Sequence, residues 1–239
     1  MNNPVSKKPV SHVPALERGL KILEWMASRE DAATLTQIAR GLDLGIPEVQ
    51  RPVACLEETG YLRHLSSGAY VLSGKLFSVA SHHPPQHRLR RAAEPAMIAF
   101  AAQTGQSVHL SLPDGDAALM ILDVPGEGLV RLSLRSGARF HPKDTVSGAL
   151  LASVGAIAKP KGFRVPAALK RALRDAQPFS RESQQVEGVL DVGILVRDTE
   201  RRVLGVLTAS VITPRNGEVN LPALSAALQK AVARLTETI

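Results

Sequence analysis

The sequence predicts an α+β protein with an N-terminal winged helix-turn-helix domain and a larger C-terminal domain of strands and helices. Two observations predict this. Three helix-like segments and a hairpin signal follow one another over residues 13–75, and strand-like runs alternate with helix-like segments over residues 95–239. The chain has 239 residues, of which 44% are hydrophobic, so two modest domains can each bury a core.

The first two helices are indicated by apolar spacing and by capping. Residues 1–12 are polar and predict a flexible tail. Leu16, Leu20 and Leu23 then recur at the spacing of one helix face, as an amphipathic helix requires. Thr34 and Gln37 form a capping box, in which each side chain can meet the backbone N–H of the other residue. This pair predicts where a second, short helix begins.

A third helix and a wing complete the first domain. Asp43 lies in the turn between the second and third helices, where its tolerance of the left-handed conformation is useful. Pro47 suits a helix start, and Gly60 suits its end. Pro52 falls inside this helix, and we expect it to kink or split the helix because it removes a backbone hydrogen bond. The Ser66–Gly68 turn between two strand-like runs predicts the hairpin of the wing.

The rest of the chain predicts a linker region, residues 76–94, and a second domain. Pro84 and Pro85 interrupt the linker region. Alternating and apolar runs predict strands, and Ala-rich or periodic runs predict helices. We expect strands at 107–112, 117–124, 130–134, 188–196 and 203–211, and helices at 89–103, 145–154, 167–176 and 222–236.

The composition excludes several classes of function. Only 3% of residues are aromatic, which argues against a stacking platform for single strands or RNA. One cysteine, Cys55, which we expect in the core, cannot form an internal disulfide. His82, His83 and His87 lack the spacing of a tetrahedral metal set. No signal peptide, membrane span or catalytic motif is recognisable, so we expect a cytoplasmic protein that is not an enzyme and needs no metal or cofactor.

The net charge of +7 invites a nucleic-acid interpretation, but its distribution does not carry one. Residues 1–75 hold nine basic and eight acidic groups, a net charge of +1, whereas residues 161–239 hold +4. The DNA-binding interpretation therefore depends on the helix pattern. On that pattern, the third helix offers Gln50 and Arg51 to base edges or phosphates in the major groove.

The remaining predicted DNA contacts come from the second helix and the wing. Thr34 and Thr36 can donate to phosphates from the start of the second helix, although Thr34 can also serve only as a cap. Arg63, Ser66 and Ser67 are candidate backbone or minor-groove contacts in the wing. Each of these side chains, like Arg51, can also be merely solvated.

Six segments in order resemble the IclR family of bacterial transcriptional regulators. They are VPALERGLKILEWMA, TLTQIARGLDLGIPEVQRPVACLEETGYL, GAYVLSGKL, TVSGALLASV, EGVLDVGILVRD and VLGVLTASVITPR. The resemblance implies a linker helix, a GAF-like (PAS-like) α/β effector-binding domain, an operator in double-stranded DNA and homodimers that often pair into tetramers. The alternative is a small-molecule-binding or interaction module with a degenerate DNA-binding head, for which Pro52 is the main argument.

The resemblance also implies where an effector binds, with an organic acid as the expected class. It places backbone N–H groups of Thr145 and Val146 against a small carboxylate, which a helix N-terminus suits. Asp191, Thr208 and Ser210 are candidate pocket groups, since Thr208 and Ser210 share one strand face. An aspartate would repel a carboxylate ligand and so hints at a less acidic effector.

Bland alternatives stay open for the same residues. The start of the helix near Thr145 can be ordinary capping, and the polar strand face can point outward. Leu119, Leu132 and Leu150 are candidate apolar lining and equally candidate core.

Overall fold

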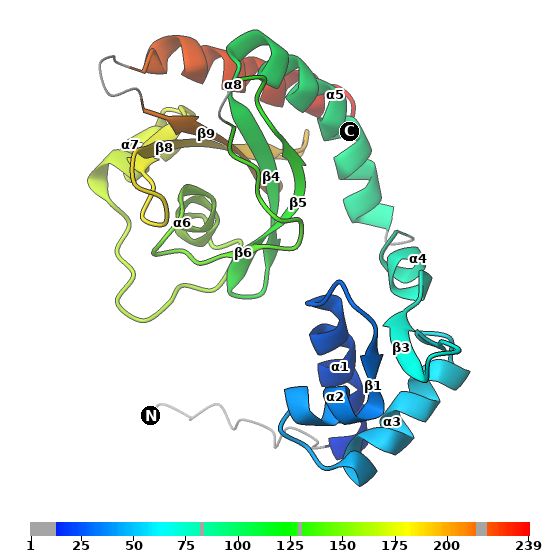
Figure 1. Ribbon diagram of the computed structural model, residues 1–239. Coiled ribbons are helices and arrows are strands. Elements are labelled where there is room, and N and C mark those ends of the chain that lie inside the picture. The colour runs from blue at the N-terminus through cyan, green and yellow to red at the C-terminus, as the bar shows by residue number, and fades with distance from the viewer. Residues whose placement is uncertain (1–12, 82–83, 129–130, 214–218) are drawn as a thin grey trace, which may run out of the picture. The chain divides into compact units, whose positions relative to one another are not determined.

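The computed structural model describes residues 13–81, 84–128, 131–213 and 219–239. The chain divides into two compact units between His83 and Pro84 (Figure 1). Residues 76–94, the predicted linker region, therefore contribute to both units. Within the described ranges, no helix combines the length and the apolar character that crossing a bilayer requires.

The first unit is a winged helix-turn-helix with a three-stranded sheet. Its core consists of side chains with at most 1% exposure, such as Ile22, Ile38, Val49 and Leu62. The strand order is β1-β3-β2, and all pairings are antiparallel. The elements are α1 (Pro14–Ala27), β1 (Ala33–Thr34), α2 (Leu35–Gly41), α3 (Ile46–Glu58), β2 (Leu62–His64), β3 (Ala69–Leu72) and α4 (Lys75–Ser81).

Local signals in the sequence set the helix boundaries of this unit. The predicted capping box is present: the Gln37 N–H donates to Thr34 Oγ1, and the Thr34 N–H donates to Gln37 Oε1. Asp43 has φ +54°, the left-handed conformation expected for this turn. The two-residue strand β1 was not predicted, and it pairs Thr34 with Ala69 of the wing.

The prediction that Pro52 splits the third helix is wrong, because α3 runs unbroken from Ile46 to Glu58. Proline inside a helix costs about 3 kcal/mol. Val49 and Val53 on the same helix are almost fully buried, and each contributes about 1.5–3 kcal/mol by that burial. Packing of this face therefore offsets the hydrogen bond that Pro52 cannot make.

The second unit is built on one antiparallel sheet of six strands in the order β6-β5-β4-β9-β8-β7. The predicted helices and four of the predicted strands are found close to their expected positions. The elements are α5 (Pro84–Thr104), β4 (Ser107–Asp114), β5 (Ala117–Val124), β6 (Arg139–Phe140), α6 (Val146–Ser153), α7 (Ala167–Arg174), β7 (Phe179–Glu182), β8 (Val189–Arg197), β9 (Val203–Ile212) and α8 (Leu221–Thr236).

Helices cover both faces of this curled sheet (Figure 1). Helices α5 and α8 lie together on one face, where Met97, Phe100 and Leu228 join the main apolar core. Helix α6 lies on the other face, inside the curl, against β8 and β9. The second face is thus apolar beneath α6 and free to carry polar groups beside it.

The predicted strand at 130–134 is wrong for its described part, residues 131–134, which have no strand structure. Side chains hold this segment in place of a strand ladder. Asp123 Oδ2 accepts hydrogen bonds from Ser133 Oγ and the Leu134 N–H, and Ser107 Oγ donates to the Leu132 carbonyl. Conversely, the short strands β6 and β7 were not predicted.

Candidate nucleic-acid interface and effector pocket

One face of α3 is exposed and carries the predicted reading residues. Val49 and Val53 anchor the opposite face in the core, so Gln50 and Arg51 point away from the unit and are exposed. Within the described ranges, neither side chain makes a hydrogen bond or an ion pair with the protein. Their amide and guanidinium groups are therefore available to a partner outside the unit.

Glu48, at the start of the same helix, is already occupied by protein partners. Its Oε2 accepts a hydrogen bond from the Gly45 N–H at 3.0 Å, and its Oε1 pairs with Arg18 Nη2 at 2.8 Å. The residue therefore acts as a cap that also ties α3 to α1. The sequence analysis missed Arg18, which is 30 positions away and matches no motif.

The other predicted DNA contacts lie on α2 and the wing. Thr36 is exposed, and the half-buried Thr34 forms the capping box. Arg63 lies exposed on β2, and Ser66 and Ser67 are exposed in the turn that Gly68 completes with φ +81°. The pairing of β1 with β3 ties the start of α2 to the wing.

Two ring contacts stiffen the wing. Tyr70 stacks on His64 with 4.6 Å between ring centroids, as expected for a residue that packs the wing. The ammonium group of Lys75 lies 4.7 Å from the centre of the Tyr61 ring. The strands of the wing are therefore held by side chains on both sides of the hairpin.

The expectation that Cys55 is a core residue is wrong, because the thiol is exposed. It lies at an apolar groove of about 580 Å³ in the first unit. Leu16 and Leu20 beside it are 60% and 50% exposed, which is unusual for leucines on an amphipathic helix. The lining residues are Ala15, Leu16, Gly19, Leu20, Leu23, Arg51, Pro52, Cys55, Leu56, Tyr61 and Leu76.

In the second unit, four of the five predicted effector residues line one pocket: Thr145, Asp191, Thr208 and Ser210. The sheet brings them together, since Asp191 is the cross-strand partner of Ser210. We call this hollow the effector pocket. Its volume is about 60 Å³, and its lining residues are His109, Leu132, Leu134, Phe140, Thr145, Ser183, Gln185, Val186, Val189, Asp191, Thr208 and Ser210.

Asp191 is a partly desolvated carboxyl group with several partners. Ser210 Oγ donates to its Oδ1 at 2.7 Å. Burial raises the pKa of Asp191, while hydrogen bonds from Ser210 and Ser183 and the positive charge of Arg181 oppose that rise. Arg181 is the cross-strand neighbour of Asp191 on β7. The arrangement leaves a carboxyl group at the pocket surface that hydrogen-bond donors stabilise.

His109 was missed by the sequence analysis. It is the cross-strand partner of Thr208, is only 4% exposed, and packs on Phe140 with 5.3 Å between ring centroids. Burial lowers its pKa to about 4, so the imidazole is neutral at pH 7. A signal was present, because Ser107, His109 and Ser111 alternate along an otherwise apolar strand and so share one face.

The start of α6 borders the pocket. Thr145 Oγ1 accepts a hydrogen bond from the Gly148 N–H, so the capping role is real. The side chain of Val146 is buried in the core and is not part of the lining. Ser147 Oγ lies 3.2 Å from Thr208 Oγ1, which links the helix to the sheet.

Of the three leucines proposed as lining, only Leu132 contacts the pocket. Leu150 is a core residue beneath α6, and Leu119 is half-buried on β5 away from the lining.

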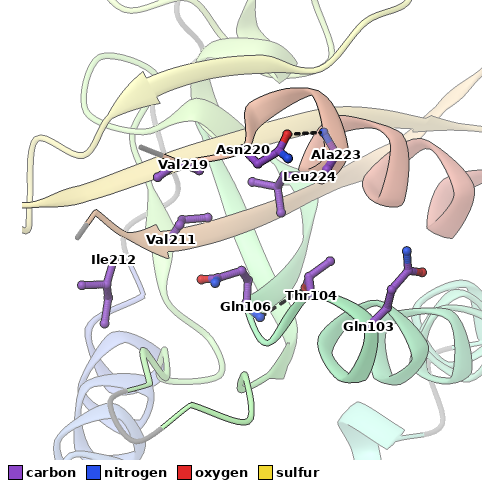
Figure 2. A pocket seen from close by; sticks show the side chains of 9 residues that line it. All are labelled: Gln103, Thr104, Gln106, Val211, Ile212, Val219, Asn220, Ala223 and Leu224. Atoms are coloured by element: carbon purple, nitrogen blue, oxygen red, sulfur yellow. Dashed lines mark hydrogen bonds between the residues drawn. The ribbon is translucent and has the colours of Figure 1, made fainter. Parts of the chain in front are cut away.

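A second hollow, of about 320 Å³, lies at the α5 and α8 side of the same unit (Figure 2). We call it the amide-lined cleft. Two of its polar groups are used internally: Thr104 Oγ1 accepts from the Gln106 N–H, and Asn220 Oδ1 accepts from the Ala223 N–H. Its described lining contains none of the predicted effector residues and no ionisable group: Gln103, Thr104, Gln106, Val211, Ile212, Val219, Asn220, Ala223 and Leu224.

No three His, Cys, Asp or Glu side chains converge as metal ligands in the described ranges. His82 and His83, which the sequence analysis considered, lie outside those ranges.

Comparison with known proteins places the first unit in a family. Residues 15–66 match the IclR helix-turn-helix domain. The chain is 26% identical to the transcriptional repressor IclR of Escherichia coli over 54% of its length, spanning 48% of that relative. It is 24% identical to the regulator XynR of the same organism, with 95% of this chain and 97% of that protein aligned.

Solved structures share the fold of the whole chain. The Thermotoga maritima IclR has a TM-score of 0.73 at 20% identity, with 95% of this chain and 98% of that chain covered. An IclR homolog from Microbacterium hydrocarbonoxydans, complexed with 4-hydroxybenzoate, has a TM-score of 0.74 at 20% identity, with 94% and 98% covered. With its matched helix-turn-helix domain and its aligned relatives, the chain belongs to the IclR family of transcriptional regulators.

Proposed function

We propose that the chain is a sequence-specific regulator that binds an operator in double-stranded DNA through α3 and the wing. The carrying observation is that Gln50 and Arg51 project, without protein partners in the described ranges, from a continuous helix anchored by buried valines. A broken α3 would have favoured a degenerate head, and α3 is unbroken. A regulator of this kind acts on chromosomal DNA in the cytoplasm and needs no catalytic step.

We infer further that a small molecule in the effector pocket modulates operator binding. Thr145, Asp191, Thr208 and Ser210 supply polar groups that can fix a ligand's orientation, and Leu132 and Phe140 supply an apolar wall. The 4-hydroxybenzoate complex of a structural neighbour supports a ligand site in this fold. The family resemblance favours an organic acid. Such a ligand changes DNA affinity only if it binds the DNA-competent arrangement differently from the other one.

We infer self-association through the apolar groove of the first unit. Exposed leucines on α1 and the groove beside them form a continuous apolar surface, and such surfaces mark interfaces. A two-fold pair of these units requires a roughly palindromic operator. Pairing of two such dimers would give the tetramer that the resemblance implies.

Selection of genomic fragments on the purified protein tests the proposal. We expect enrichment of a short palindromic sequence over bulk DNA at about 100–150 mM salt, because non-specific binding weakens steeply with salt. Failure to enrich any sequence would remove the regulatory function.

A further inference from the structure

Asp191 is the one group among the described lining residues of the effector pocket that carries a charge at pH 7. His109, the other ionisable side chain there, is buried and has no printed charge partner in the described ranges. Arg181 lies beside Asp191 on β7 but is not part of the lining, and its Nη1 donates to the Lys143 carbonyl. The pocket therefore presents a carboxylate to its ligand and no cation.

The unused acceptor capacity of Asp191 sets what can bind there. A carboxylate offers about four lone-pair sites, and Ser210 uses one of them at 2.7 Å. A ligand carboxylate at the same place would set two like charges together in a partly desolvated site, whereas a hydroxyl or ammonium group would donate to the free oxygen. Asp191 thus discriminates between donors and acceptors.

The size of the pocket adds a second restriction. Its volume is about 60 Å³, well below the ~150 Å³ of an engineered cavity that binds benzene. An aromatic ring does not fit between Phe140 and the sheet in this arrangement. A short aliphatic molecule does.

We propose that the effector is a short aliphatic molecule whose hydroxyl or ammonium group donates a hydrogen bond to Asp191. The proposal rests on the proposed function and names the ligand class of its pocket. It admits a hydroxy acid or an amino acid, provided that the donor and not the carboxylate faces Asp191. The apolar remainder of the ligand would lie against Leu132 and Phe140.

Matched pairs of compounds test this on the full-length protein. We would measure dissociation constants by calorimetry for glycolate against acetate, lactate against propionate, and alanine against propionate, with 4-hydroxybenzoate and benzoate as an aromatic pair. At least one donor-bearing aliphatic compound should bind tenfold or more tightly than its partner. If no aliphatic pair shows this preference, or if the aromatic compounds bind most tightly, the proposal is overturned.

Variants locate the preference. Asp191→Leu should abolish it, and Asp191→Asn, which keeps the shape of the side chain, should reduce it several-fold. If Asp191→Leu does not fold, the Asn variant decides. Gln106→Ala in the amide-lined cleft is the control and should change nothing; loss of binding there with the preference intact in Asp191→Asn would contradict the proposal.

The fragment selection keeps the two proposals apart. Operator enrichment without a donor preference removes only the ligand class. A donor preference that depends on Asp191, in a protein that enriches no DNA sequence, removes the regulatory function and leaves the binding site.

Discussion

His109 is a neutral imidazole held inside the second unit, and it makes the stability of that unit depend on pH. Its pKa is about 4 when folded, against an ordinary value of 6.5. As pH falls below 6.5, the unfolded chain takes up a proton that the folded unit refuses until pH 4, so stability is lost across that window. Between pH 7 and pH 5 the loss from this group is about 2 kcal/mol.

Urea unfolding of His109→Leu at the two pH values checks this prediction. The variant should lack the part of the pH dependence that His109 supplies, relative to the unsubstituted chain. His141→Gln, which alters an exposed histidine, should retain the full dependence. An unchanged dependence in His109→Leu would show that the imidazole titrates normally.

Arg51 is the single side chain on which the DNA-binding proposal depends most. Arg51→Ala should weaken operator binding by about 1–3 kcal/mol, or about ten- to a hundredfold, because one base or phosphate contact is lost. Fluorescence anisotropy on the selected operator measures this, and ligand binding in the second unit should be unaffected. Arg90→Ala, an exposed arginine on α5, is the control. Equal affinities for all three proteins would refute the assignment.

At the scale of elements, Gly193 decides how closely α6 approaches the sheet. A Cβ atom at Gly193 would lie 2.5 Å from Val146 Cγ1 and 3.0 Å from Leu150 Cδ1. Gly193→Ala should therefore lower the free energy of unfolding by about 1–3 kcal/mol, the usual cost of overpacking. It should also disturb the contact between Ser147 and Thr208.

Thermal denaturation measures the effect of Gly193→Ala. Gly19→Ala on α1 is a matched control, since a Cβ atom there meets nothing within 4 Å. That variant should be neutral or slightly stabilising, because alanine favours a helix over glycine. If Gly193→Ala behaves in the same way, α6 does not depend on the missing side chain.

The elements that the sequence predicts well are those with a local cause. The capping box at Thr34, the left-handed turn at Asp43 and the alternation of Thr208 with Ser210 each depend on residues close in sequence. Pro52 was misjudged because its cost is local, whereas the packing of Val53 that offsets it comes from other elements.

The missed features depend on distant partners. Strand β1 exists because Thr34 meets Ala69 in the wing, and β6 consists of two residues paired with β5. The wall of the effector pocket is held by Asp123, which no local pattern connects with Leu134. The membership of Asp191 and Thr208 in one pocket was predicted only through the family resemblance, because cross-strand register cannot be deduced from single strands.

For the molecule as a whole, the groove beside α1 makes assembly and DNA binding interdependent. Leu20→Glu would place a charge on the apolar surface, and we expect the chain to sediment as a smaller species at micromolar concentration. Operator affinity should fall as well, since a single head reads only a half-site. Analytical ultracentrifugation with Leu20→Ala as the milder variant checks this. An unchanged mass for Leu20→Glu would place the interface elsewhere.

The exposed thiol of Cys55 has a practical consequence. It is the chain's one cysteine and lies at the apolar groove. A maleimide dye or a nitroxide therefore labels each chain once, without any engineered substitution. Such a probe would report the polarity of the groove directly, and pulsed dipolar spectroscopy on the same label would give the separation of two reading heads with and without a ligand.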